Sequence, residues 1–175
     1  AMQRIEQTSS FSPFSATLYG ELAQVLYHRH QLEEAREYFS RSVEWSILGG
    51  FSDAKIYHSV FLSRLFQMDG DLQASLQEIE KALELTQTAW MAPALVMEEV
   101  IAQQVSIFLA LDRFAPVQTV LKRYGFGFDN GFSFPELAPE STPQAAVSHA
   151  KGLLYNSALR TRLYAAGRKD DQQAL

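Results

Sequence analysis

The chain has 175 residues, of which 47% are hydrophobic and 20% are charged, a composition typical of a globular protein and not of a disordered one. It contains no cysteine, which excludes disulfide bonds, thiolate metal sites and a cysteine nucleophile and makes the cytoplasm the default location. The net charge of -5 argues against binding of phosphate backbones, because such binding depends on clustered lysine and arginine. No apolar run approaches the roughly 18 residues that a membrane-spanning helix needs.

The two ends of the chain have the character of a cut segment. An alanine before a methionine at residues 1–2 is typical of a cleaved purification tag. Residues 168–175 begin like a helix that is too short to stand alone. We therefore expect the chain to be a fragment of a longer protein.

Hydrophobic spacing and capping residues predict an all-helical chain. Proline follows serine at 12–13 and threonine at 142–143, an arrangement typical of a helix start. Asp71 is placed to cap the helix after Gly70, and the glycines at 49–50 are placed to end the second helix. In chain order, the predicted helices lie at about 13–29, 32–47, 52–69, 72–87, 92–110, 113–124 and 143–166, with an eighth beginning near residue 170.

A repeat with a period of about 40 residues organises these helices. Segments 30–35 and 70–75 each join two predicted helices, and they place Ala35 and Ser75 one period apart. At matching positions the first unit has Tyr19, Leu22, Ala23, Leu26, Ala35 and Phe39. The second unit has Ser59, Leu62, Ser63, Phe66, Ser75 and Ile79 at these six positions, and Ala82 follows them. The third unit has Ile101, Gln104, Val105, Phe108, Val117 and Leu121.

These residues resemble the tetratricopeptide pattern W-x2-L-G-x2-Y followed by A-x3-F, in which small residues let two antiparallel helices touch closely. Val105 and Val117 are bulky where the pattern has small residues. The sequence thus predicts an all-α, tetratricopeptide-like α-solenoid of about three to four helix pairs, with an ordinary helical bundle as the alternative. We expect a single domain over 1–175, with units at about 13–48, 52–88 and 92–124, an insertion at 125–142 and a partial fourth unit at 143–175.

The insertion contains the one predicted non-helical element. Residues 124–135 alternate phenylalanine with small residues around a turn signal, which favours a short β-hairpin. A three-residue loop at 129–131 would put four rings on one face of the hairpin. In that register Phe128 lies opposite Phe132, and Phe126 lies opposite Phe134. An irregular loop held by the phenylalanines is the alternative.

The stretch from Leu18 to Phe39 resembles the superhelical sensor region of MalT-like, LuxR-type bacterial transcription regulators. The long repeat period adds to this resemblance, because the usual tetratricopeptide period is shorter, at about 34 residues. The segment at 152–160 is similar to the first helix of a later repeat in that family. There a P-loop ATPase module precedes the repeats and a DNA-binding helix-turn-helix follows them. The resemblance implies a middle segment that senses an inducer or a protein partner and leaves DNA binding to a separate C-terminal module.

The sequence offers no constellation of catalytic or metal-binding residues. There is no G-x-x-x-x-G-K-[ST] phosphate loop, no basic recognition helix and no G-x-S-x-G elbow. The histidines at 28, 30, 58 and 149 lack ligand spacing, so we expect them at the surface or packed in turns. The acidic pairs at 33–34 and 98–99 are expected to be charges on helix surfaces. We predict a protein that is not an enzyme and needs no cofactor.

The first helix of each unit in a solenoid lines the concave side, which is the usual groove for a peptide or ligand. Counting along the pattern, the residues expected there are Gln24, Tyr27, His28, Tyr57, Arg64 and Gln103, with Asn156 from the next unit. Amides, phenols and a guanidinium suit hydrogen bonding to a protein, a peptide or a small polar inducer. Plain solvent exposure is the alternative for each residue.

Aromatic residues on the helices are expected in the core instead, and these are Tyr38, Phe39, Trp45, Phe61 and Phe66. The rival to the regulator is a generic peptide-binding adaptor. In either case the sequence is compatible with a homodimer and predicts no contact with a membrane.

Overall fold

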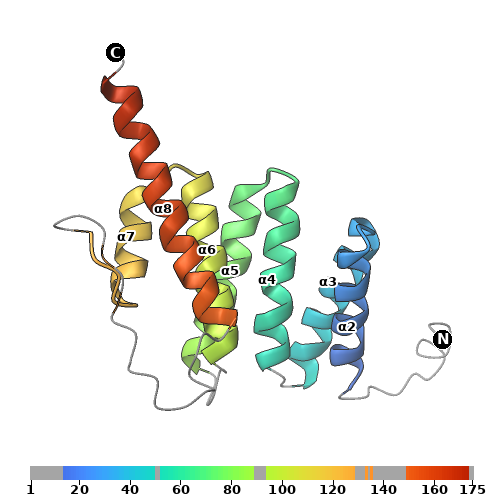
Figure 1. The fold of residues 1–175 in the computed structure, drawn as a ribbon. Coiled ribbons are helices and arrows are strands. Elements are labelled where there is room, and N and C mark those ends of the chain that lie inside the picture. The colour runs from blue at the N-terminus through green and yellow to red at the C-terminus, as the bar shows by residue number, and fades with distance from the viewer. Residues whose placement is uncertain are drawn as a thin grey trace. The chain divides into compact units, whose positions relative to one another are not determined.

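The structure is a computed structural model that describes residues 14–49, 52–88, 94–128, 133, 135 and 149–173. These ranges contain seven helices, which are labelled in Figure 1. In chain order they are α2 (Ser15–His28), α3 (Leu32–Gly49), α4 (Ser52–Met68), α5 (Leu72–Thr88), α6 (Ala94–Ala110), α7 (Phe114–Lys122) and α8 (His149–Gln173). The chain divides into two compact units, unit 1 (Ala1–Ala92) and unit 2 (Pro93–Leu175).

Unit 1 consists of two stacked helix pairs. Helix α2 packs on α3, α4 packs on α5, and the second helix of the first pair lies on the first helix of the second pair. One cluster of buried residues joins the pairs: Ala23, Leu26, Ala35, Phe39, Phe61, Leu62 and Leu65. At the rim, the guanidinium of Arg36 pairs with the carboxylate of Asp69 and lies 5.1 Å from the ring centroid of Phe66. This arrangement confirms the predicted helical-repeat packing for unit 1.

Small residues form the seam within each pair of unit 1, as the pattern predicts. Ala23 and Ala35 are both fully buried where α2 meets α3. Ser63 and Ser75 take the same positions between α4 and α5, and each hydroxyl donates to the other residue's carbonyl, at 2.9 and 2.8 Å. Because the two backbones approach closely, the hydroxyls find carbonyl acceptors without leaving the seam. Serine is therefore accepted where alanine would also fit.

One turn geometry recurs in all three helix pairs. His30, Gly70 and Asp112 have φ of 58°, 82° and 62°, the left-handed conformation that ends a helix. The next residue in each turn donates its backbone N–H to the carbonyl five residues earlier, at 2.9, 3.0 and 2.8 Å. The helix that follows Gly70 is capped as predicted, because Asp71 Oδ1 accepts the backbone N–H of Ala74 at 2.9 Å. The repeat register thus continues from unit 1 into α6 and α7.

Unit 2 uses this register with a different packing. Val105 and Val117 are both fully buried at the seam positions of α6 and α7. Helix α7 has nine residues, and α6 packs more extensively against α8 than against α7. The buried row of α8 contains little apolar bulk, and its members are Leu154, Ser157, Ala158 and Thr161.

Helix α8 departs from the prediction of two separate helices at its end. It runs without a break from His149 to Gln173, so the predicted stop near residue 166 and the eighth helix near 170 are wrong. Gly167 lies within the helix, and a Cβ there would meet nothing within 4 Å. A glycine in an exposed helix lowers stability without ending the helix. The predicted start near 143 lies outside the described residues.

The β-hairpin predicted at 124–135 is not found, because the described residues form no strand there. A single antiparallel bridge joins Gly127 and Ser133, with backbone hydrogen bonds of 2.9 and 3.1 Å. This bridge pairs the two residues that the expected register places opposite each other. Residues 129–132 and 134, with the predicted loop and two of the four rings, lie outside the described residues.

Aromatic packing holds the segment after α7 in place. Phe126 is buried, and its ring lies 5.4 Å from that of Tyr155 on α8 at an interplanar angle of 74°. The Tyr155 hydroxyl lies 3.4 Å from the carbonyl oxygen of Pro135. Gly125 has φ of 86°, and a Cβ there would lie 2.9 Å from the Pro135 side chain. A glycine is therefore required at this turn.

Candidate functional site

Three of the predicted groove residues converge on one phenylalanine of unit 1. Tyr57 lies four residues before Phe61 on α4 and Arg64 lies three residues after it, so the three side chains share one side of the helix. The Tyr57 ring is 5.4 Å from the Phe61 ring at 79°, and the Arg64 guanidinium is 5.1 Å from the same ring. Tyr27 on α2 meets Phe61 at 5.4 Å and 78°. We call these four residues the Phe61 cluster.

The centre of the Phe61 cluster is fixed by the core beneath it. Phe61 is 5% exposed and stacks on Phe39 of α3 at 4.9 Å and 11°. Both rings belong to the buried cluster that joins the two helix pairs. Each contacting ring in an edge-to-face or stacked pair restricts the rotamers of the other. The outer members of the cluster therefore rest on a rigid base.

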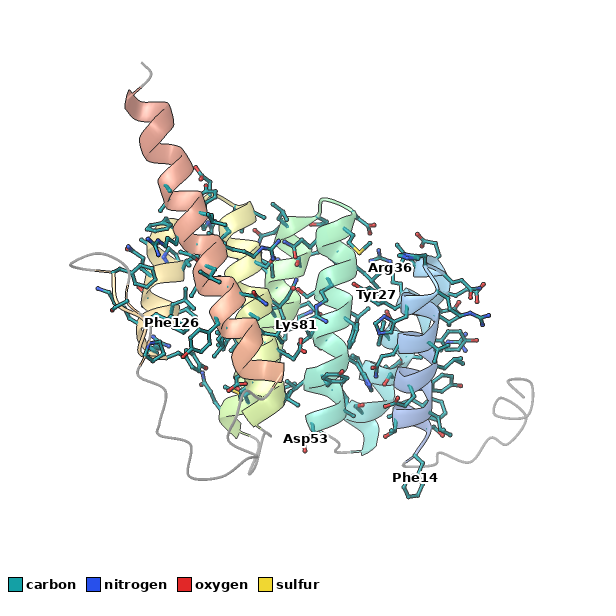
Figure 2. All side chains as sticks on the ribbon, in the orientation of Figure 1. Phe14, Tyr27, Arg36, Asp53, Lys81 and Phe126 are labelled. Carbon is teal, nitrogen blue, oxygen red and sulfur yellow. The ribbon has the colours of Figure 1, made fainter. Side chains whose placement is uncertain are left out.

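The outer members present polar atoms at half-buried positions. Tyr27, Tyr57 and Arg64 are half-buried. Along α2, Gln24 is half-buried and His28 is exposed, and the His28 ring lies 5.6 Å from that of Tyr27. Figure 2 shows Tyr27 on α2 on the side of α4. Five of the seven predicted residues thus belong to unit 1.

Unit 2 holds the other two predicted residues, and one of them is not at an open surface. Gln103 on α6 is 5% exposed, so the prediction that it lines an open groove is wrong. Glu99, one helical turn earlier, is 8% exposed, and it was expected to be a surface charge. Helix α8 packs along α6 in the same unit. Asn156 on α8 is exposed.

The other acidic residue of that pair also departs from the surface prediction. Glu98 on α6 is half-buried. Burial, and then the negative charge of Glu98, raise the pKa of the Tyr124 hydroxyl, while Arg123 acts in the opposite direction. By contrast, Glu33 and Glu34 are exposed in the first turn of α3, as expected for charges that the helix dipole favours.

His58 is the residue whose place the sequence analysis missed. It is 2% exposed at the junction of three helices, where its Nδ1 lies 2.7 Å from the Ser42 hydroxyl oxygen. The Ser42 hydroxyl donates to the carbonyl of Ala16 at 2.5 Å, so the imidazole N–H is the donor toward Ser42. Burial lowers the pKa of His58 to about 4, which keeps the ring neutral near pH 7.

Gly20 makes room for the His58 ring. A Cβ at Gly20 would overlap the imidazole, far inside van der Waals contact. Gly20 thus allows α2 to contact α4 at His58, although the two helices belong to different pairs. The repeat pattern assigns no residue type to either position, so this contact could not be predicted from the sequence. The role of His58 is structural.

Within the described ranges, no group of three or more histidine, aspartate or glutamate side chains is placed to hold a metal ion. No helix in the same ranges combines the length and the apolar character needed to cross a membrane. The Phe61 cluster itself consists of three aromatic rings and one guanidinium.

A family comparison agrees with the geometry of α2 to α5. Residues 14–88 match the family model described as Tetratricopeptide repeat. That segment comprises the two helix pairs of unit 1, including the whole Phe61 cluster. Repeats of this family are generally non-catalytic modules for protein–protein interaction. No curated protein matches the chain.

Proposed function

We propose that the Phe61 cluster is the centre of a binding face for a protein or peptide segment. The observation that carries the proposal is the convergence of Tyr27, Tyr57 and Arg64 on one buried ring. Interfaces of proteins favour tyrosine and arginine, because these side chains combine a large apolar contact with hydrogen-bond donors. The family match of the same segment supports a role in protein interaction.

The chemistry of the face indicates how a ligand would be held. Rings that are already packed lose little conformational entropy on binding, which favours affinity. The phenol groups of Tyr27 and Tyr57 and the amide of Gln24 offer donors and acceptors for a peptide backbone. The planar guanidinium of Arg64 suits a carbonyl or a carboxylate. An inducer or peptide with polar and acidic groups is the ligand that these residues would recognise.

The test is selection of peptides from a phage-displayed random library against the intact chain, followed by measurement of their dissociation constants. Tyr57→Phe and Arg64→Gln should weaken binding about tenfold each, since each loses hydrogen bonds to the ligand. Tyr38→Phe is the matched control, because Tyr38 is also half-buried but stacks on Tyr19 outside the cluster. Equal affinities for all three variants and the original chain would refute the proposal.

We further infer that this binding face belongs to the sensor segment of a LuxR-type, MalT-like transcription regulator. The long, nearly even spacing of the left-handed turns and the resemblance of residues 18–39 support this reading. In this role the ligand would prefer one of two states of the regulator and so bias its ATPase and DNA-binding modules. DNA would be bound by the separate module, in the cytoplasm, and both units would act as one repeat domain.

A generic tetratricopeptide adaptor fits the family match equally well. The reading frame of the source gene separates the two functions. A G-x-x-x-x-G-K-[ST] motif before this segment and a basic helix-turn-helix after it are expected for the regulator. A gene with neither would overturn the regulator and leave the adaptor, whose peptide-binding test is unchanged.

A further inference from the structure

Helix α2 exposes a row of large apolar side chains. Phe14, just before the helix, is 74% exposed, and Leu18 and Val25 are 55% and 52% exposed. Figure 2 shows Phe14 projecting away from the helices. Glu21 is exposed between the two aliphatic residues, because residues three and four apart share one side of a helix. We call these four residues the α2 row.

The repeat register shows what such a row does elsewhere in the chain. Each helix pair can be aligned on the left-handed residue of its turn, which is His30, Gly70 or Asp112. In this alignment Leu18 corresponds to His58 of α4 and Val100 of α6, and Val25 corresponds to Leu65 and Ile107. Those four side chains of α4 and α6 are at most 2% exposed.

On α4, the residues equivalent to Leu18 and Val25 pack against a helix, α3. His58 meets Ser42 and Phe39 of α3, the second helix of the preceding pair. Leu65 belongs to the same buried cluster as Phe39. The equivalent row on α2 is therefore shaped to receive a helix with an apolar side. Leu18 and Val25 lie at these positions and Phe14 lies one turn before Leu18, so the three are grouped and not scattered singly as surface apolar residues normally are.

Helix α8 presents a matching surface. Leu159 and Leu163 lie one turn apart and are 43% and 72% exposed. Arg160 is exposed beside them. The buried side of α8 carries Ser157 and Thr161, whose hydroxyls donate to carbonyls of their own helix at 2.8 and 2.7 Å. The helix thus turns Leu159 and Leu163 outward, while Ser157 and Thr161 lie on the buried side with Leu154 and Ala158. We call Leu159, Arg160 and Leu163 the α8 row.

We propose that the α2 row of one molecule packs against the α8 row of a second copy of this chain. Charge decides between this pairing and a symmetric one. Two α2 rows packed antiparallel would bring Glu21 near the same residue of the other copy, and two α8 rows would do the same with Arg160. The mixed pairing places Glu21 and Arg160 in one interface, where their opposite charges favour association.

This pairing is heterologous, since each copy contributes a different surface. An open assembly then has an unused α2 row at one end and an unused α8 row at the other, so it grows with concentration unless it closes into a ring. The interface does not involve the Phe61 cluster, so it is independent of the proposed ligand-binding function.

The test is analytical ultracentrifugation of the intact chain over about 5 to 500 µM, a span that brackets micromolar association. We expect the mean mass to rise with concentration. Leu18→Glu and Leu163→Glu should each weaken association about 10- to 100-fold, because each puts a charge in place of a leucine that the proposed interface buries. Ile47→Glu and Met68→Glu are matched controls, since these residues are 59% and 56% exposed outside both rows.

Mixing the two disabled variants separates the mixed pairing from the symmetric ones. Leu18→Glu keeps an intact α8 row and Leu163→Glu keeps an intact α2 row, so together they should form a dimer and nothing larger. A chain that stays monomeric throughout the concentration range overturns the proposal. Loss of association in one of the two variants alone, or a mixture that remains monomeric, overturns it as well. Circular dichroism of each variant checks that the fold is intact.

Discussion

The helix pairs of unit 1 meet through alanine and serine, whereas α6 and α7 of unit 2 meet through two valines. Where Ala23 faces Ala35, or Ser63 faces Ser75, the helix backbones approach closely and the pair is extensive. Where Val105 and a second valine take these positions, α6 finds its larger partner in α8. The size of two seam residues thus accompanies a change in which helices pack together, although the turn between them is the same.

This difference bears on function. In unit 1 the outer members of the Phe61 cluster, Tyr27, Tyr57 and Arg64, are half-buried. In unit 2, Glu99 and Gln103 of α6 are buried. The proposed binding face accordingly uses residues of unit 1 alone.

The largest expected effect concerns His58, a titratable group in the core of unit 1. Its pKa falls from 6.5 to about 4 on folding, so between these pH values the unfolded chain binds the extra proton. The contribution of neutral His58 to the free energy of unfolding is therefore fully present above pH 6.5. It is lost as the pH falls to 4, which lowers stability by about 3 kcal/mol. Urea unfolding at pH 7, 5.5 and 4 measures this loss. His58→Leu should flatten the slope, and an unchanged slope would assign the loss to other groups.

Gly20→Ala tests the close approach of α2 and α4. The new methyl overlaps the buried His58 ring, so we expect a loss of about 3 kcal/mol through overpacking. Gly152→Ala is the control in unit 2, because its Cβ meets nothing within 4 Å. There the better helix propensity of alanine should raise stability by about 0.5–1 kcal/mol. Thermal unfolding of both variants gives the comparison, and equal effects would remove the basis for the Gly20–His58 contact.

The seams should respond to side-chain size in opposite directions. Ala35→Leu overfills the contact of α2 with α3 and should cost about 1–3 kcal/mol. In unit 2, Val117→Ala should also cost about 2 kcal/mol, but through the cavity that it leaves. Urea unfolding measures both. If Ala35→Leu were neutral or Val117→Ala stabilising, the assigned register of the corresponding seam would be wrong.

The smallest predicted effect lies in the turns. His30 has a left-handed backbone, which costs a residue with a side chain about 1 kcal/mol. Glycine avoids this strain, but it loses more backbone entropy on folding, which offsets part of the gain. His30→Gly should therefore raise stability by about 0.5 kcal/mol. Gly70→Ala should lower it by about 1 kcal/mol at the equivalent position. Opposite signs confirm that the two turns share one geometry, and equal signs contradict it.

Most of the fold of unit 1 can be predicted from the sequence, because its helices and seams are set by residues close together in the chain. Periodicity, Gly70 and the Asp71 cap place the helices, and the repeat period places the seams. The convergence of three predicted residues follows from the same register, since Tyr57 and Arg64 lie within one turn of Phe61. The register did not single out Phe61 itself as the centre of the site, because a large aromatic residue in a repeat is ordinarily core.

Unit 2 is less readable because its decisive contact is distant in sequence. From the sequence alone, Leu159 and Leu163 would be expected on the buried side of α8, but both are exposed. Gly167 would be expected to end the helix, but α8 continues through it. Gln103 is 5% exposed, which its place in the pattern did not indicate. The location of His58 has a similar cause, since the Gly20 opposite it lies two helices earlier in the chain and no motif links the two.

Native-state hydrogen exchange, followed helix by helix, tests the contrast between the two units most directly. If α8 is the main partner of α6, the amides of these two helices should be the slowest to exchange in unit 2 and should open together, with α7 exchanging faster. If α7 were protected as strongly as α6 while α8 exchanged first, α6 and α7 would form the stable pair. That result would contradict the packing described above, in which α8 and not α7 is the main partner of α6.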